Sequence, residues 1–237
     1  MKGDTVSEFF PGAKVDESIP DEPGYYDLPP EQQLEVQREA MQRYQCINIP
    51  ARYATARLDE WTTPTPRHEA ILAAVRRYAD RVNTDPVFWE KPLGVIFHGA
   101  AGTGKTNLAV SLMWEIVRMG RRGLFVDMAA LARELSLEYN DNDGEYSGDI
   151  IGDLRCFRIA LIDDLGAERI TPDVMAKLVD IIHHRYNDLQ ITIFTSNLEW
   201  PREFEERYGK QAVSRLTESC RAIAMPEMDF RAERIEP

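Results

Sequence analysis

A glycine-rich segment between two apolar stretches constrains this chain more than any other feature. Residues 99–106 read GAAGTGKT and fit the pattern GxxxxGK[ST] without a mismatch. The apolar run LGVIF precedes the segment, and a run with helical spacing follows it. Glycines let the backbone turn so that successive N–H groups face phosphate oxygens, and the helix adds its positive dipole end. The pattern therefore predicts a phosphate loop between a strand and a helix, with an ordinary glycine-rich turn as the alternative.

Residue types within this loop predict individual contacts. Lys105 is expected to reach the β- and γ-phosphates of a nucleoside triphosphate, and Thr106 is expected to ligate Mg²⁺. The other positions expected around the phosphates are Gly99, Ala100, Ala101, Gly102, Thr103, Gly104 and Asn107.

Short apolar runs alternate with amphipathic runs along most of the chain. Strands are predicted at residues 93–98, 123–127, 159–163, 191–195 and 222–225. Helices are predicted at residues 66–82, 105–119, 129–139, 150–157, 173–187 and 211–218. This alternation favours an α/β fold in which helices cover both faces of a parallel sheet.

An acidic pair follows one of these strands in the segment FRIALIDDLG. Asp163 and Asp164 stand at the carboxyl end of the strand, which is the edge where open α/β sheets place their ligands. Asp163 is expected to hold Mg²⁺, and Asp164 is expected to orient the attacking water. Two solvated acids in a strand-end turn are the alternative.

Three further polar residues are candidates for contacts with a γ-phosphate. Asn197 follows the apolar strand in QITIFTSNLEW, although Ser-Asn is also ordinary turn chemistry. Arg215 lies in a helical pattern in GKQAVSRLTESC, and Arg231 follows the last strand in MDFRAER. An arginine stabilises charge on a transferring phosphoryl group. An exposed surface arginine is the alternative in both cases.

The first 45 residues differ in texture from the rest of the chain. They hold ten acidic residues against four basic ones, and five prolines occur up to residue 30. Such a segment buries too little apolar surface to offset the entropy of ordering. We therefore predict a flexible acidic N-terminal arm at residues 1–45 and a domain that carries the phosphate loop at residues 46–237. The arm is either a solvated tail or a docking segment for a partner protein.

Composition narrows the class of protein further. The formal net charge of −12 excludes a generally basic nucleic-acid coat protein but not a local basic groove. Three scattered cysteines form no disulfide framework, and the four histidines show no metal-ligand spacing. No secretory signal or membrane-length apolar run occurs, so a cytoplasmic protein without membrane contact is expected.

Five motifs together resemble the AAA+ P-loop ATPases, and within them the DnaC-type helicase loaders and the IstB-like ATP-binding proteins. In chain order they are NIPARYATARLDEW, GAAGTGKTNLA, ALIDDLG, TSN and AVSRLTESCRAIAM followed by DFR. The resemblance spans residues 46–231. It implies ATP as the nucleotide, Asn197 as the first sensor, Arg215 as an arginine finger and Arg231 as a second sensor. It also implies that residues 49–53 lie beside the adenine.

The resemblance implies a function as well. We expect ATP-dependent loading of a replicative helicase onto single-stranded DNA, with self-association into a ring or spiral that places one subunit's finger in the next subunit's site. One alternative is a transposition helper ATPase that assembles on duplex DNA and recruits a transposase. Another is an ATP-gated adaptor that hydrolyses slowly.

Two departures from the family pattern affect these expectations. Many relatives have Asp-Glu where this chain has Asp163 and Asp164, so hydrolysis is expected to be slow and stimulated by DNA or a partner. The acidic stretch at residues 137–149 would repel phosphates. Nearby arginines would then have to make any contact with DNA. The alternative is that these arginines form a solvated surface. They are Arg118, Arg121, Arg122, Arg133, Arg155 and Arg158.

Overall fold

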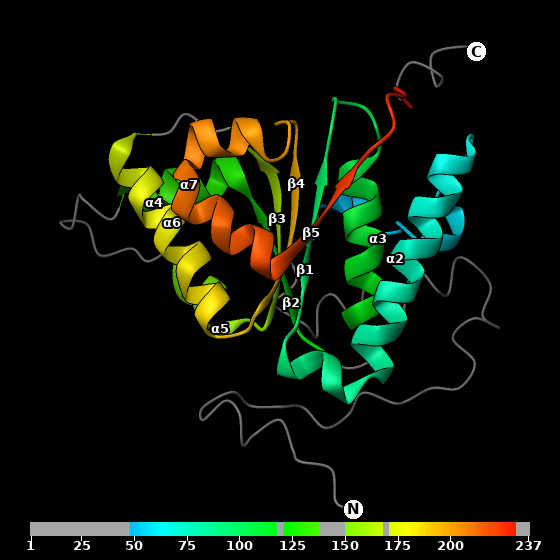
Figure 1. Ribbon diagram of the computed structural model, residues 1–237, viewed down its shortest axis with the longest axis horizontal. Coiled ribbons are helices and arrows are strands. Elements are labelled where there is room, and N and C mark those ends of the chain that lie inside the picture. Colours follow the sequence, from blue (N-terminus) through cyan, green and yellow to red (C-terminus); the bar gives the residue numbers. More distant parts are fainter. Residues whose placement is uncertain (1–47, 118–120, 138–149, 168–170, 231–237) are drawn as a thin grey trace, which may run out of the picture.

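The computed structural model describes residues 48–117, 121–137, 150–167 and 171–230 (Figure 1). Its centre is a five-stranded parallel sheet with the strand order β2-β3-β4-β1-β5. The strands are β1 (Gly94–His98), β2 (Gly123–Asp127), β3 (Ile159–Leu165), β4 (Ile191–Ser196) and β5 (Cys220–Ala224). The predicted α/β class with a parallel sheet is confirmed.

Helices cover both faces of this sheet (Figure 1). One face carries α2 (Pro66–Thr84) and α3 (Lys105–Val117). The other face carries α4 (Met128–Leu137), α5 (Ile150–Cys156), α6 (Pro172–Asn187) and α7 (Arg202–Ser219). Within the described residues, three short 3₁₀ helices precede β1, namely η3 (Ala51–Tyr53), η4 (Leu58–Glu60) and η5 (Pro86–Glu90).

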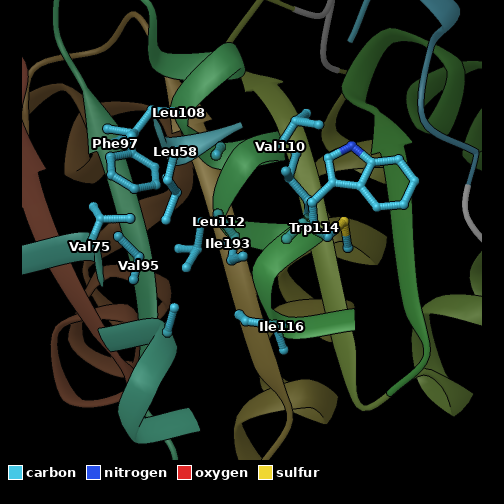
Figure 2. Packing of buried hydrophobic residues seen from close by; sticks show 14 of the residues in the cluster. Leu58, Val75, Val95, Phe97, Leu108, Val110, Leu112, Trp114, Ile116 and Ile193 are labelled. Carbon is cyan, nitrogen blue, oxygen red and sulfur yellow. The ribbon is translucent and has the colours of Figure 1, made fainter. Parts of the chain in front are cut away.

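Alternation along the strands divides the core into two layers. In β1, Val95 and Phe97 belong to the layer beneath α2 and α3, whereas Ile96 belongs to the layer beneath the other helices. Figure 2 shows the first layer, in which Leu112 of α3 lies beside Ile193 of β4. Because α3 packs between the sheet, α2 and η4, nearly all of its side chains are buried.

Helices α2 and α6 begin with the same N-capping pattern. Thr65 and Thr171 are the N-cap residues, and their side chains accept hydrogen bonds from the backbone N–H groups of His68 and Val174. A proline follows each cap at the first helical position, where its missing N–H costs nothing.

Several element boundaries differ from those predicted. Helix α7 begins at Arg202 rather than at residue 211, because Gly209, with φ of 82°, introduces a kink that hides the helical pattern. Strand β5 starts at Cys220, two residues early, and β3 continues to Leu165, two residues beyond the predicted end. The predicted helix 129–139 is α4, Met128–Leu137.

Several predicted features lie outside the described residues. These are the acidic arm at residues 1–45, most of the acidic stretch at residues 137–149, Arg118 and Arg231. Among the described residues, no helix combines the length and apolar character that crossing a membrane would require.

Candidate nucleotide site

The glycine-rich segment forms a loop between β1 and α3, as predicted. Gly99, Gly102 and Gly104 all have positive φ, at 137°, 82° and 82°. Residues with a side chain rarely adopt this conformation, so the loop depends on glycine at these positions. Lys105 is buried, and its Nζ donates hydrogen bonds to the carbonyl oxygens of Gly99 (2.9 Å) and Ala100 (2.7 Å). The lysine charge therefore lies over the loop.

Asp163 is buried between the loop helix and the neighbouring strand. Thr195 Oγ1 donates a hydrogen bond to Asp163 Oδ1 (2.5 Å) and accepts one from the backbone N–H of Asp164 (2.8 Å). Thr106 also lies near Asp163. Burial raises the pKa of Asp163, and the nearby hydroxyls of Thr195 and Thr106 oppose that rise. The two predicted Mg²⁺ ligands, Thr106 and Asp163, are thus neighbours.

Asp164 points to a different partner from its neighbour. Its φ is +61°, and the register between β3 and β4 shifts at this point. The side-chain amide of Asn197 donates a hydrogen bond from Nδ2 to Asp164 Oδ1 (2.9 Å). Positive φ is uncommon for residues other than glycine, and the residues that adopt it cluster at functional sites. The structure therefore brings Asp164 and Asn197 together, 33 residues apart in the sequence.

The C-terminal segment follows β5 along the phosphate loop. The backbone N–H of Met225 donates to the His98 carbonyl (2.8 Å), and that of Phe230 donates to the Gly102 carbonyl (3.1 Å). A carbon added at Gly102 would lie 2.1 Å from Asp229 Oδ1, so the carboxylate packs directly against the loop. Arg231, the next residue, is outside the described residues.

Comparison with known proteins gives the family. The model of the family described as IstB-like ATP binding protein matches residues 84–234. This chain belongs to the IstB-like ATP-binding protein family. The matched residues include the phosphate loop, the acidic pair and Asn197.

Relatives of this family member include helicase loaders and a mobile-element protein. The replicative helicase loader DnaI of Bacillus subtilis is 23% identical over 211 residues, covering 85% of this chain and 65% of DnaI. An ATP-binding protein of insertion sequence IS5376 from Geobacillus stearothermophilus is 28% identical over 113 residues, covering 46% and 42%. The chain spans 56–65% of the length of the helicase loaders it matches.

Solved structures agree on the fold. The crystal structure of the DnaC helicase loader superposes with a TM-score of 0.64 at 27% identity, covering 75% of this chain and all of that one. The sheet of this IstB-like protein is thus the AAA+ P-loop sheet that the sequence predicted.

Arg215 does not lie with the other candidates. It belongs to α7, on the opposite sheet face from α3, and its guanidinium carbon lies 5.8 Å from the ring centre of Tyr186 in α6. Its Nε is buried and has no hydrogen-bond partner among the described residues. Burial and, less strongly, the nearby Arg215 charge lower the pKa of His183. The structure therefore does not bring Arg215 together with the phosphate loop.

Two features of the site were not predicted from the sequence. One is Thr195, which joins Asp163 and Asp164; its strand-end position was the only available signal. The other is an aromatic cluster at Gly104, where Trp61 and Phe230 both lie near the glycine and both rings contact His68, with centroids 5.6 Å apart. No local pattern links these three residues. The backbone carbonyl of Tyr53, in the predicted adenine segment, accepts from Trp114 Nε1 (3.4 Å), which holds the segment against α3.

Proposed function

We propose that this chain is a Mg²⁺-dependent ATPase that loads a replicative helicase onto single-stranded DNA through nucleotide-dependent self-association. The observation that supports the proposal best is the group of Thr106, Asp163 and Thr195, which places the acidic strand beside the phosphate loop. It brings a metal-binding carboxylate beside a loop built to hold phosphates.

The residues present fit a magnesium ion. Thr106 and Asp163 offer a hydroxyl and a carboxylate oxygen, which are the hard ligands that Mg²⁺ prefers. When bound, Mg²⁺ neutralises charge on the β- and γ-phosphates. Thr195 fixes the Asp163 carboxylate, and Lys105 supplies the positive charge of the loop.

Asp164 and Asn197 have the separate task of handling water. Asn197 holds one oxygen of Asp164, so the second oxygen remains to accept a proton from the attacking water. Water then adds to the γ-phosphorus as its bond to the β-phosphate oxygen breaks, giving ADP and phosphate. Aspartate is one methylene shorter than glutamate, so we expect slow turnover that DNA or a partner stimulates.

Assembly completes the proposed site. Arg215 lies on the sheet face opposite α3, so we assign it as an arginine finger in the site of the next subunit. Arg231 follows Phe230, whose backbone contacts Gly102, and we assign it as a second sensor of the γ-phosphate. Residues 49–53 would lie by the adenine, and residues 1–45 would form a docking arm beside the domain at 46–237.

The first test measures nucleotide binding by the full chain. Lys105→Ala should weaken binding of a fluorescent ATP analogue by about 100-fold, because a charged hydrogen bond of about 3 kcal/mol is removed. Lys177→Ala, on α6, is the matched control and should bind normally. Circular dichroism checks that both variants fold. Unchanged affinity in Lys105→Ala would contradict the phosphate-loop assignment.

The second test identifies the partner. With ATP, the chain should capture the replicative helicase of its own genome and place it on circular single-stranded DNA. A transposition helper is the second candidate, because the family match and the insertion-sequence relative favour it. Capture of a transposase on duplex DNA, with no helicase captured, would replace the first candidate by the second. ATP-dependent capture without measurable hydrolysis would instead identify a gated adaptor.

A further inference from the structure

The edge of the sheet opposite the phosphate loop, where the strands begin, carries a group of arginines. Arg121 and Arg122 immediately precede β2, Arg158 precedes β3, and Arg155 lies in the last turn of α5. We call these four residues the arginine edge. Because β2 and β3 are paired neighbours in the sheet, the residues that precede them lie side by side.

Two of these arginines share one aromatic ring. The guanidinium carbon of Arg158 lies 4.4 Å from the ring centre of Trp89 in η5, and that of Arg121 lies 5.1 Å from it. The ring is itself anchored, since Trp89 Nε1 donates to the Val82 carbonyl (3.0 Å). Arg121 Nη1 also donates to Asn83 Oδ1 (3.0 Å). Two positive charges are therefore held together in fixed positions.

Carboxylates do not neutralise this edge within the part of the chain that the structure describes. Among the other exposed arginines there, three pair with acids, namely Arg76 with Asp59, Arg81 with Asp85 and Arg202 with Glu199, whereas Arg77, Arg133 and Arg221 form no ion pair with a described residue. The side chains of Arg122, Arg155 and Arg158 make no ion pair or hydrogen bond to any described residue. In a chain with a net charge of −12, unpaired cations gathered at one edge are unexpected.

We propose that the arginine edge binds the phosphate backbone of a nucleic-acid strand. A guanidinium presents a planar set of donors that matches phosphate oxygens, and a strand carries one charge per nucleotide, so neighbouring arginines can be neutralised together. The chain as a whole is negative and repels phosphates, so contact with a nucleic acid depends on a local group of cations such as this edge. The inference rests on the proposed function, because it names the surface through which the ATPase holds DNA.

The test is fluorescence anisotropy of a labelled single-stranded oligonucleotide with the full chain and a non-hydrolysable ATP analogue, between about 50 and 200 mM salt. The double variant Arg121→Gln/Arg158→Gln should bind about tenfold more weakly. The slope of log affinity against log salt should fall by about 1.4, which corresponds to two lost contacts with single-stranded DNA.

Matched variants separate charge from fold. Arg76→Gln removes an exposed arginine that already pairs with Asp59, so its DNA affinity and slope should equal those of the wild type. Arg158→Lys keeps the charge and should keep the salt slope while losing part of the affinity. Binding of the ATP analogue should be unchanged in every variant, which excludes unfolding as the cause.

Each remaining outcome decides the proposal. Wild-type affinity and slope in the double variant would overturn it, as would a wild-type protein that binds no DNA at low salt. If the double variant binds DNA normally but no longer captures the helicase, the edge faces a protein, and exposed Val87 and Leu189 at the same edge would belong to that interface. If helicase capture fails in the wild type while DNA binding depends on the arginines, the proposed function falls and the arginine edge stands.

Discussion

At the carboxyl ends of the strands, Asp163 is held by Thr195, and Asp164 is held by Asn197. At the opposite ends, the Arg158 side chain lies over Trp89 and makes no hydrogen bond to a described residue. The first edge is already organised by its own side chains, as a site needs if it is to stabilise charge without rearranging. At the second edge, the guanidinium donors of Arg122, Arg155 and Arg158 are unused within the described residues, as on a surface that meets a partner of opposite charge.

Arg215→Ala should cause the largest change in the rate of ATP hydrolysis. This variant tests whether the site at the carboxyl ends of the strands is complete within one chain. An arginine finger contributes about 10³–10⁵ in rate, so Arg215→Ala should bind ATP normally and hydrolyse it poorly. Mixing Arg215→Ala with Lys105→Ala should restore part of the activity, since some interfaces then combine an intact loop with an intact finger. Turnover assays with DNA present measure this.

Co-assembly of the two variants must be verified by a sizing experiment. If they co-assemble and mixing restores nothing, Arg215 does not act in trans. If Arg215→Ala alone hydrolyses ATP like the wild type, the residue is an ordinary surface arginine.

Asp164→Asn should reduce turnover by about 10²–10⁴ while nucleotide binding is kept, because it removes a general base but no phosphate contact. Asp188→Asn is the control, since Asp188 is an exposed acid at the other edge that pairs with His184. Steady-state hydrolysis and analogue binding are compared for both. Equal loss of binding and turnover in Asp164→Asn would show that the two aspartates do not divide the work.

The next comparison is between two arginines near the second edge, the buried Arg185 and the exposed Arg158. Arg185 is 2% exposed and donates to Thr192 Oγ1, to Gln190 Oε1 and to the carbonyls of Leu154, Phe157 and Ile191. Arg185→Met should lower the free energy of unfolding by about 3 kcal/mol, because it leaves buried carbonyls without a donor. The melting temperature should fall by roughly 6–12 °C. Arg158→Met, which breaks no hydrogen bond, should stay within about 0.5 kcal/mol of the wild type. Equal melting temperatures for Arg185→Met and Arg158→Met would show that the buried arginine contributes no more to stability than the exposed one.

Asp163→Asn should have a small effect on stability, and the size of that effect depends on pH. Burial raises the pKa of Asp163 in the folded state, so the ionised carboxylate lowers the free energy of unfolding at neutral pH. Removing that charge should raise the melting temperature by about 2–4 °C for about 1 kcal/mol.

The difference should shrink as pH falls through the folded-state pKa, because the wild-type carboxyl then becomes protonated. With Mg²⁺ and nucleotide present the order should reverse, since the variant loses a metal ligand. Thermal melts at several pH values, with and without Mg-ATP analogue, measure both effects. If Asp163→Asn is less stable than the wild type at neutral pH, burial of the ionised carboxylate does not destabilise the folded state.

Local patterns in the sequence predicted most of the fold. The strands from residue 93 to 195 were placed within two residues, because buried parallel strands are short apolar runs with clear ends. Helix α7 was predicted too short, since Phe204 and Tyr208, which bury its first half, are separated from the later pattern by Gly209. Strand β5 is a weak run at the sheet edge, where two of its side chains are exposed, and its start was therefore misplaced.

The sequence by itself determined the phosphate loop, because all of its parts are contiguous and glycine conformation is a local property. It also determined the order of the acidic strand, Asn197 and Arg215 along the chain. Only the tertiary structure decided that Thr195 joins the two aspartates, that Phe230 contacts Gly102 and that the Trp89 ring contacts two arginines. These contacts join segments from 31 to 128 residues apart, and strand register and helix packing fix them rather than any spacing a single segment displays.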